Sequence, residues 1–402
     1  MVADINGAVD RRESIALMEP LQIPEASRHR ASLIDLAIEL AQASASFRSG
    51  MPSGVRQPLS DLVRAMNCYY SNLIEGHDTH PIEIERALAN DYSPDPRKRD
   101  LQLEAKAHIA VQRWIDAGGV HDRAATEPAV REIHTRFCAA LPEDLLWVEH
   151  PATQQRLRVS PGELRTCDVK VGRHVPVSPG AVPRFLARFE EAYARPGRTD
   201  AILAVAAAHH RLVWIHPFLD GNGRVARLVS HAMLLDALDT GGVWSVSRGL
   251  ARNVDAYKRK LAECDLQRRN DLDGRGNLSE EALAEFTRFF LEVSLDQVRF
   301  MESLVQPDRL RARILLWAEE ETRIGGLPAR SGSILEAVLY RGELPRGDVG
   351  ALLGTSDRQA RRVVAALVER GALAAEEARA PLRLSFRAAL ASRWMPGLFP
   401  ER

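Results

Sequence analysis

The chain has 402 residues, enough for two or three domains. Its 54 Lys and Arg side chains balance its 54 Asp and Glu side chains, so no global field steers it toward nucleic acid. No apolar run reaches the roughly 18 residues of a membrane-spanning helix, which argues against an integral membrane protein. Few aromatic residues, scarce β-branched runs and abundant Ala, Leu and Arg favour a mostly helical, soluble protein.

The N-terminus and the cysteines indicate the compartment. The first residues, MVADINGAVDRRES, are charged and lack the apolar core of a secretory signal. The four cysteines are scattered, which is typical of reduced thiols and not of disulfides or zinc ligands. We therefore expect a cytoplasmic protein.

The first hundred residues predict helices after an irregular lead-in that ends near residue 27. Residues 31–47 have helical periodicity, and a stretch rich in Gly and Pro then breaks it. Ser60 is a suitable N-cap for a second helix, over about residues 60–76, in which Gly76 is the terminator. Residues 81–90 predict another helix, and residues 91–99 a polar loop broken by prolines.

The middle of the chain predicts amphipathic helices over residues 101–114, 128–141 and 182–193. We interpret His108 and His134 on the first two as packing or surface residues, since they have no partners at metal-ligand spacing. Between the second and third helices, residues 165–172 and 174–176 predict two strands joined by a turn. An isolated hairpin is barely stable alone, so it needs a packing or binding partner.

Two apolar segments, residues 201–215 and 228–238, predict buried helices on either side of the loop HPFLDGNGRVAR, residues 216–227. Gly221 and Gly223 allow backbone N–H groups to point inward, at the positive end of the second helix. Arg224 and Arg227 lie three residues apart and project from the same side of its first turn. The loop therefore predicts a phosphate cradle.

Two groups in this loop are suited to chemistry beside a phosphate. His216 has an ordinary pKa near neutrality and is able to take a proton from a hydroxyl. Asp220 offers a hard oxygen ligand for Mg²⁺ bridging two phosphates. Phe218 is expected to point into the core and fix the loop.

The last third of the chain predicts helices over residues 244–261, 282–301 and 311–322, followed by a smaller unit. In that unit, helices over residues 331–340, 346–353 and 357–370 precede two short strands around residues 378–381. This order is typical of a winged helix-turn-helix. Its third helix carries Arg358, Arg361 and Arg362 outward, where they would contact either DNA or a protein partner.

The loop HPFLDGNGRVAR resembles the signature of the Fic family, HPFx[D/E]GNGRxxR, with every constrained position filled. Members of this family mostly transfer AMP from ATP to a protein hydroxyl, so the resemblance implies a protein adenylyltransferase (a nucleotidyltransferase, or AMPylator) acting on Ser, Thr or Tyr with ATP and Mg²⁺. It implies a catalytic His216, a metal ligand at Asp220, and ATP contacts from Glu75, Gly221, Asn222, Gly223, Arg224, Val225, Ala226, Arg227 and Tyr257. In these assignments Asn222 and nearby N–H groups bind the α-phosphate, Arg224 the β-phosphate and Arg227 the γ-phosphate, while Tyr257 lines the adenine site.

The segment SNLIEG, residues 71–76, resembles the inhibitory motif of the same family, [S/T]xxxE[G/N]. Ser71, Glu75 and Gly76 fill its defined positions. A glutamate at a helix end is able to pair with an arginine such as Arg227, which then no longer holds a γ-phosphate. The resemblance therefore implies autoinhibition by an N-terminal helix.

The expected hairpin near residues 163–177, GELRT…VKVG, resembles the family's flap, onto which a target protein aligns by strand addition. The resemblance thus implies a docking place for the protein substrate. The sequence leaves open whether the chain forms a homodimer and which partner, DNA or protein, the winged helix takes.

We expect a mostly α fold, a Fic-type helical bundle with a β-hairpin flap, divided into four parts. They are an N-terminal helical segment with the inhibitory helix (residues 1–100), the catalytic domain (101–305), a linker helix (306–328) and a winged-helix domain (329–402).

Two alternatives to adenylylation stay open. Doc-type kinases of the family carry lysine where Gly223 stands, so glycine favours AMP transfer. The same site is also able to run in reverse as a de-AMPylase, with Glu75 positioning a water molecule. The second alternative is a DNA-binding transcription regulator with a nucleotide-sensing Fic domain.

Overall fold

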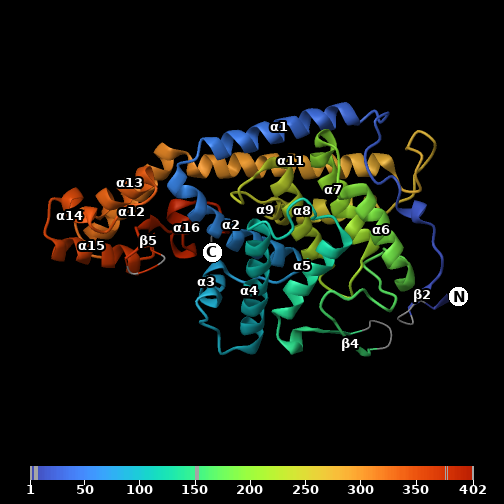
Figure 1. The fold of residues 1–402 in the computed structure, drawn as a ribbon, viewed down its shortest axis with the longest axis horizontal. Helices are drawn as coiled ribbons and strands as arrows, with labels where there is room; N and C mark the ends of the chain where they lie inside the picture. The colour runs from blue at the N-terminus through green and yellow to red at the C-terminus, as the bar shows by residue number, and fades with distance from the viewer. Residues whose placement is uncertain (1, 4–7, 150–153, 376, 378, 401–402) are drawn as a thin grey trace.

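A computed structural model describes residues 2–3, 8–149, 154–375, 377 and 379–400, and most of them lie in helices (Figure 1). The α-helices are α1 (Arg30–Ser49), α2 (Ser53–Ile74), α3 (Pro81–Leu88), α4 (Pro96–Asp116), α5 (Glu127–Ala139), α6 (Val182–Tyr193), α7 (Arg198–Ile215), α8 (Asn222–Leu238), α9 (Val246–Arg252), α10 (Val254–Glu263), α11 (Glu280–Val305), α12 (Pro307–Arg323), α13 (Ser331–Arg341), α14 (Asp348–Leu353), α15 (Asp357–Glu369) and α16 (Ala388–Trp394). Short 3-10 helices are η1 (Ile15–Met18), η2 (Glu143–Leu145) and η3 (Pro179–Ala181). The mostly helical fold class is confirmed.

The strands are short and form antiparallel pairs: β1 (Val2–Ala3) with β2 (Val9–Asp10), β3 (Trp147–Glu149) with β4 (Arg156–Arg158), and β5 (Leu373–Ala374) with β6 (Arg383–Leu384). A small hairpin therefore exists at β3–β4, but the prediction of two strands over residues 165–176 was wrong. That segment is irregular and contains a single antiparallel bridge between Val171 and His174.

Helices α7 and α8 form the centre of the larger part of the molecule and pack closely against each other. Nearly every residue of α7 from Ile202 to Ile215 is buried, which agrees with its largely apolar sequence. The long helix α11 packs on α7, and α1 runs beside α11 along one edge (Figure 1). This packing places the loop between α7 and α8 at the end of two rigid helices.

Helix α2 is longer than predicted. It begins at Ser53, seven residues before the expected N-cap Ser60, and includes Pro58 in its second turn. Pro58 lies beyond the first four residues of the helix, whose N–H groups have no partner within it, so it removes one main-chain hydrogen bond, and α2 nevertheless continues to Ile74. The end is as expected: α2 stops at Ile74, and Gly76 has a φ of 87°, a conformation that favours glycine.

Three further expectations about elements need correction. The polar loop expected over residues 91–99 is shorter, because α4 already begins at Pro96, where Asp95 caps it. The helix expected over residues 244–261 is divided at Asn253 into α9 and α10. The irregular lead-in contains η1, which Ser14 caps.

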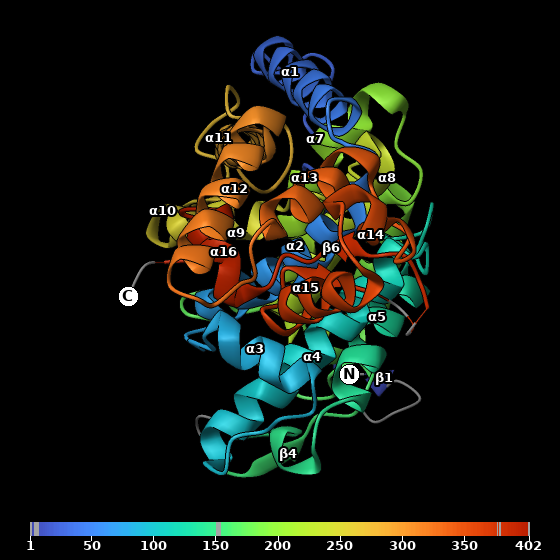
Figure 2. The same cartoon turned by 90° about the vertical axis from the view of Figure 1, so that its left-hand side faces the viewer.

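Helices α13, α14 and α15 form one end of the molecule, and α6 and β2 lie at the other (Figure 1). Helices α13, α14 and α15 precede the β5–β6 pair, and the bridge between Leu344 and Leu382 joins the start of the unit to the sheet. Both α13 and β6 pack on α2 behind them (Figure 2). Ala378 at the expected turn lies outside the described residues, and the winged-helix assignment stays a prediction.

No helix among the described residues combines the length and the apolar character needed to cross a membrane.

Candidate active site

The loop after α7 turns sharply at His216, whose backbone is left-handed (φ 52°, ψ 61°). Asn222 closes the loop: its Oδ1 accepts from Phe218 N and its Nδ2 donates to Phe218 O, both at 2.9 Å. Gly221 has a φ of 78° and leads into α8. The side-chain amide of Asn222 therefore shapes the anion-binding turn, and the backbone N–H groups at the start of α8 remain to bind an anion.

The His216 ring is held as a neutral base. Burial lowers its pKa to about 4, and the nearby charge of Arg165 acts in the same direction. A ring with this pKa is unprotonated at pH 7, the state in which imidazole accepts a proton.

Arg165 fixes the backbone on which His216 stands. Its Nε donates to His216 O at 2.8 Å and its backbone N–H to Pro217 O at 2.9 Å. Its other guanidinium nitrogens donate to the carbonyls of Cys167 and Val177. The side chain is buried, so one arginine connects the expected flap segment to the signature loop.

His134 supports the same loop from α5. Its Nδ1 accepts from Gly162 N at 2.8 Å, so Nε2 carries the proton and donates to Asp220 O at 3.2 Å. Its ring stacks on Phe218 with centroids 3.9 Å apart. Burial lowers the pKa of His134 to about 4, which keeps this tautomer neutral. The carboxylate of Asp220 itself is exposed to solvent.

Glu75, at the end of α2, forms an ion pair with Arg227 of α8. Ser71 adds two contacts to the same guanidinium, since Arg227 Nε donates to Ser71 Oγ at 2.9 Å and Nη2 to Ser71 O at 3.2 Å. Burial alone would raise the pKa of Glu75, but the opposing effects of Arg227, Arg224 and His77 together lower that pKa. The predicted inhibitory residues and the predicted γ-phosphate arginine are thus in direct contact.

The Glu75 carboxylate lies directly over Gly223. A Cβ atom at position 223 would stand 2.6 Å from Glu75 Oε1 and 3.2 Å from Arg227 Nη1. The carboxylate is therefore in the place where the turn at the start of α8 would receive an anion.

Arg224 has partners that the sequence did not indicate. Its Nη2 lies 2.8 Å from Oε1 of Glu104, on α4, and 3.1 Å from Nδ1 of His77. Phe137 of α5 lies under the guanidinium, with its ring centroid 5.6 Å away. Both arginines of the signature are thus paired with a carboxylate.

The remaining predicted ATP contacts lie behind the turn. The side chains of Val225 and Ala226 are buried. Tyr257 is also buried, and its hydroxyl lies 2.7 Å from His209 Nε2 and close to Arg227. Tyr257 therefore packs beneath the arginine that Glu75 holds, and its contact with adenine stays a prediction.

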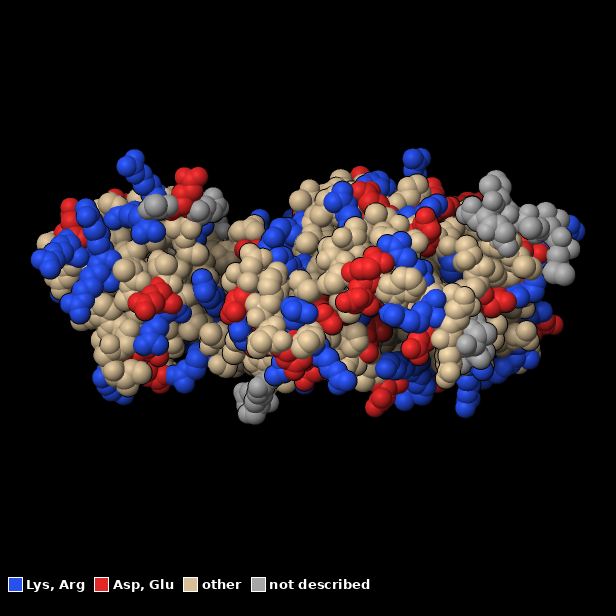
Figure 3. All heavy atoms as spheres, turned by 90° about the horizontal axis from the view of Figure 1, so that it is seen from below, with Lys and Arg blue, Asp and Glu red and all other residues tan. Residues whose placement is uncertain are grey.

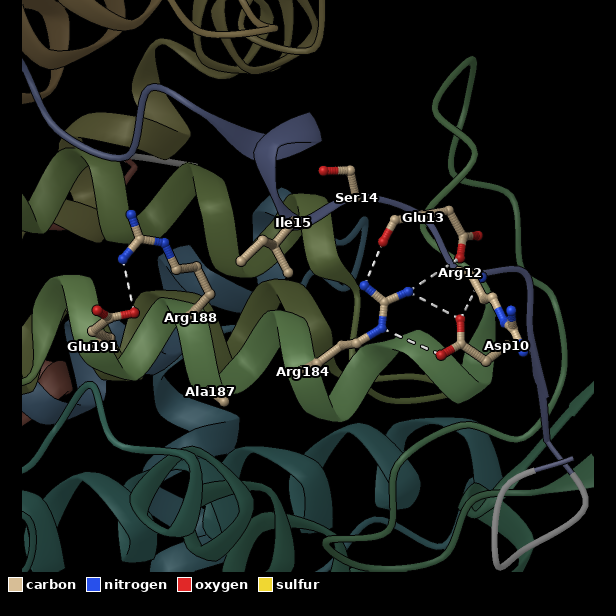
Figure 4. A pocket seen from close by; sticks show the side chains of 9 residues that line it. All are labelled: Asp10, Arg12, Glu13, Ser14, Ile15, Arg184, Ala187, Arg188 and Glu191. Atoms are coloured by element: carbon tan, nitrogen blue, oxygen red, sulfur yellow. Dashed lines mark hydrogen bonds and ion pairs between the residues drawn. The ribbon is translucent and has the colours of Figure 1, made fainter. Parts of the chain in front are cut away.

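The N-terminal segment is fastened to the expected flap. Arg11 pairs with Asp168 at 2.9 Å, and the carboxylate oxygens of Glu13 accept from Ser178 N at 2.8 Å and Ser178 Oγ at 2.6 Å. Arg184 of α6 joins Asp10 and Glu13 in the charged hollow of Figure 4, which has a volume of about 650 Å³. None of the residues that line this hollow belongs to the signature loop.

Residues 124–234 match the model of the Fic/DOC family, a range that contains the whole signature loop, α7, and α8 as far as Leu234. These residues form a Fic/DOC domain within the chain.

Two curated relatives of this chain carry the name protein adenylyltransferase Fic. The one from Drosophila willistoni is 28% identical over 222 residues, 53% of this chain and 41% of the relative. The one from Drosophila grimshawi is 28% identical over 172 residues, 42% of this chain and 32% of the relative. The chain therefore spans less than half the length of these relatives.

Two solved structures share the Fic fold. A Fic family protein from Desulfovibrio desulfuricans G20 superposes with a TM-score of 0.53 at 16% identity, over 90% of this chain and 98% of that one. Fic-1 from C. elegans superposes with a TM-score of 0.50 at 19% identity, over 67% of this chain and 72% of that one.

Sequence reasoning missed four residues of this Fic site: His77, Glu104, His134 and Arg165. The first two carry no signal, because no residue spacing links α4 or the end of α2 to Arg224. His134 was interpreted as a packing or surface residue, and the structure places it against the catalytic loop. Arg165 lies in the segment GELRT that was assigned to the flap, but its hold on His216 appears only in the fold.

Proposed function

We propose that this Fic protein transfers AMP from ATP to a hydroxyl group of a protein side chain, and that the conformation described here is its inhibited state. The Fic/DOC domain and the name of the curated relatives support the reaction type. The observation that carries the proposal is the contact of Glu75 with Arg227 and Gly223, beside the neutral ring of His216.

The turn at the start of α8 would bind the phosphates of ATP. Its backbone N–H groups and the positive end of the helix dipole favour an anion, and the absence of a side chain at Gly223 leaves room for it. Arg224 and Arg227 would hold the β- and γ-phosphates. The Nε of Arg224 is buried and has no partner among the described residues, as expected for a donor that a ligand completes.

The donor set fits Mg²⁺. Asp220 offers one exposed carboxylate close to the cradle, and Mg²⁺ is usually held by one or two carboxylates together with substrate phosphates. Bound there, the ion would neutralise phosphate charge. His134 fixes the main chain of Asp220 and so orients this carboxylate.

In the proposed reaction His216 takes the proton from the attacking hydroxyl. The hydroxyl oxygen forms a bond to the α-phosphorus, and the bond to the bridging oxygen of pyrophosphate breaks. The N–H groups at the start of α8 stabilise the charge that develops on the α-phosphate. Arg165 keeps the ring of His216 in position for this step.

Inhibition would follow from the position of Glu75. Its carboxylate occupies Arg227 and excludes a second negative group from the turn, so the triphosphate has to displace Glu75 before its γ-phosphate reaches Arg227. Displacement of Glu75 would activate the protein.

The segment over residues 163–177 would receive the protein substrate. Val171 and Val175 on it are 40% and 62% exposed, although both are apolar. Val171 and His174 bind each other through their main-chain groups, so a docking strand would pair with the neighbouring residues of the segment.

The proposal is tested with ATP labelled on the α-phosphate or on the γ-phosphate. Glu75→Gly should incorporate far more α-label into itself and into target proteins than the wild type, and adding His216→Ala should abolish incorporation. Glu263→Gly, which removes a glutamate at the end of α10, is the matched control and should behave as wild type. Transfer of γ-label would show a kinase, and no labelling by any variant would refute the transferase.

A second function is favoured by the arginines of the C-terminal unit. Arg358, Arg361 and Arg362 are exposed on α15, and Figure 3 shows Lys and Arg gathered at that end of the molecule, with some acidic side chains among them. Tight, salt-dependent binding of operator DNA that Arg358→Ala and Arg362→Ala weaken would support a regulator. The reverse reaction is tested by offering an AMP-modified target and measuring released AMP.

A further inference from the structure

Two residues outside the signature hold Arg224. The Nη2 of this arginine lies 2.8 Å from Oε1 of Glu104 and 3.1 Å from Nδ1 of His77. The same Nδ1 lies 3.2 and 3.1 Å from the two carboxylate oxygens of Glu104. The three side chains therefore form a closed triangle that joins α8, α4 and the end of α2.

The members of this triangle differ in their access to solvent. Glu104 and Arg224 are 7% and 8% exposed, whereas the side chain of His77 is 39% exposed. The ion pair of Glu104 with Arg224 is thus shielded from solvent, which strengthens its charge-assisted hydrogen bond. His77 meets water and is able to exchange a proton with it.

Nδ1 of His77 cannot serve both neighbours in one state. With a proton it donates to Glu104 and is repelled by Arg224; without one it accepts from Arg224 and presents its lone pair to the carboxylate. The hydrogen bond to Glu104 raises the pKa of His77 above its ordinary value, Arg224 opposes this, and the charge of Glu75 adds to it. The protonated form therefore persists to a higher pH than in a free histidine.

We propose that Glu104 is a positioning residue of the phosphate site, which fixes the guanidinium of Arg224 for the β-phosphate and couples it to the protonation of His77. The proposal rests on ATP binding in the cradle. One edge of the guanidinium is held by Glu104, while the buried Nε has no partner among the described side chains. A phosphate would complete an arginine that is already oriented.

Protonation of His77 changes the charge of the triangle. With the ring protonated, two positive charges stand against one negative charge; with the ring neutral, the charges cancel. An additional positive charge beside the cradle attracts the triphosphate. ATP should therefore bind more tightly below the pKa of His77 than above it.

The experiment measures the Kd of Mg-ATP by isothermal titration calorimetry in the full chain carrying Glu75→Gly and His216→Ala, which binds without turnover. Adding Glu104→Gln should raise Kd about tenfold, because the arginine loses its charged partner. Glu132→Gln is the matched control. Glu132 also pairs with two arginines, but at the surface of α5, and its change should leave Kd unaltered.

The pH dependence separates positioning from a general structural role. From pH 6 to 8.5, Kd should rise with pH in the parent, and His77→Gln should remove that step. Glu104→Gln should move the step to lower pH, because the carboxylate that raises the pKa of His77 is gone. The ionisation of ATP itself is common to all variants and cancels in these comparisons.

A Kd for Glu104→Gln within twofold of the parent overturns the proposal. A tighter Kd overturns it as well, since Glu104 would then compete with the triphosphate. If circular dichroism shows that Glu104→Gln does not fold, the half-exposed His77→Gln carries the test, and an unchanged pH step there is a refutation. Normal ATP binding without AMP transfer in Glu75→Gly would refute the proposed function alone, and no ATP binding in any variant would refute both.

Discussion

Replacing Glu75 by alanine or glycine should lower the free energy of unfolding and strengthen the binding free energy of ATP by the same amount. Removing one partner of a buried ion pair costs about 3–5 kcal/mol. The Glu75 side chain is 34% exposed while Arg227 is 2% exposed, so solvent screening reduces this to about 2 kcal/mol. In the wild type, ATP must displace the Glu75 carboxylate, and the free energy of its ion pair with Arg227 is lost on binding. In the variant this ion pair is already absent, so ATP binding does not break it.

The expected result is therefore a nucleotide-free variant less stable by about 2 kcal/mol and a Kd for Mg-ATP lower by about 30-fold. Urea unfolding without nucleotide gives the first value, and calorimetric titration with His216→Ala also present gives the second. Alanine is compared with glycine, because glycine adds backbone freedom at the helix end. A loss of stability with an unchanged Kd would refute the reasoning, since Glu75 would then not stand in the path of the triphosphate.

Three further predictions concern the loop that carries His216. In the Glu75→Gly background, Arg165→Lys should lower the transfer rate about 100-fold with little change in ATP affinity, because lysine cannot bind the same carbonyl groups. Quench-flow measures the transfer rate and calorimetry the ATP affinity. An equal loss of transfer rate and ATP affinity would contradict the prediction. Asn222→Ala should lower the free energy of unfolding by about 3 kcal/mol, since the buried N–H and C=O of Phe218 lose their partner, and urea denaturation measures it. Since burial lowers the pKa of His216 to about 4, its ring should stay neutral from pH 8 to about 5 in the nucleotide-free protein. ¹⁵N NMR of the ring nitrogens should show a titration near pH 4. A titration midpoint near 6.5 would contradict the lowered pKa of His216.

The signature loop could be predicted from sequence because its function is local. Two apolar segments flank a twelve-residue loop with two glycines and two arginines, and this pattern already predicts a helix start that binds anions. The contact of Glu75 with Arg227 crosses more than 150 residues, and the expectation for it came from the resemblance of a second motif. Glu104 and His77 belong to no motif. Their contact with Arg224 depends on how α4 packs beside α8, which a sequence pattern does not encode.

The expected flap strands failed for a physical reason. The segment alternates like a strand over residues 165–172, but the guanidinium of Arg165 binds the carbonyls of Cys167 and Val177 within the segment itself. Those carbonyls are then no longer available to a ladder, and the segment keeps one bridge. Alternating apolar and polar residues indicate which side chains face inward. They do not show which main-chain groups are bound by a buried side chain such as Arg165.

The glycine at position 223 makes the evolution of two distant positions interdependent. A Cβ atom there would stand 2.6 Å from Glu75 Oε1, so an alanine would displace the carboxylate and narrow the proposed nucleotide site in one step. A lineage that abandons Glu75 gains room above residue 223, and only then does a larger side chain become tolerable. When both positions change in evolution, we therefore expect the substitution of Glu75 to precede the substitution of Gly223.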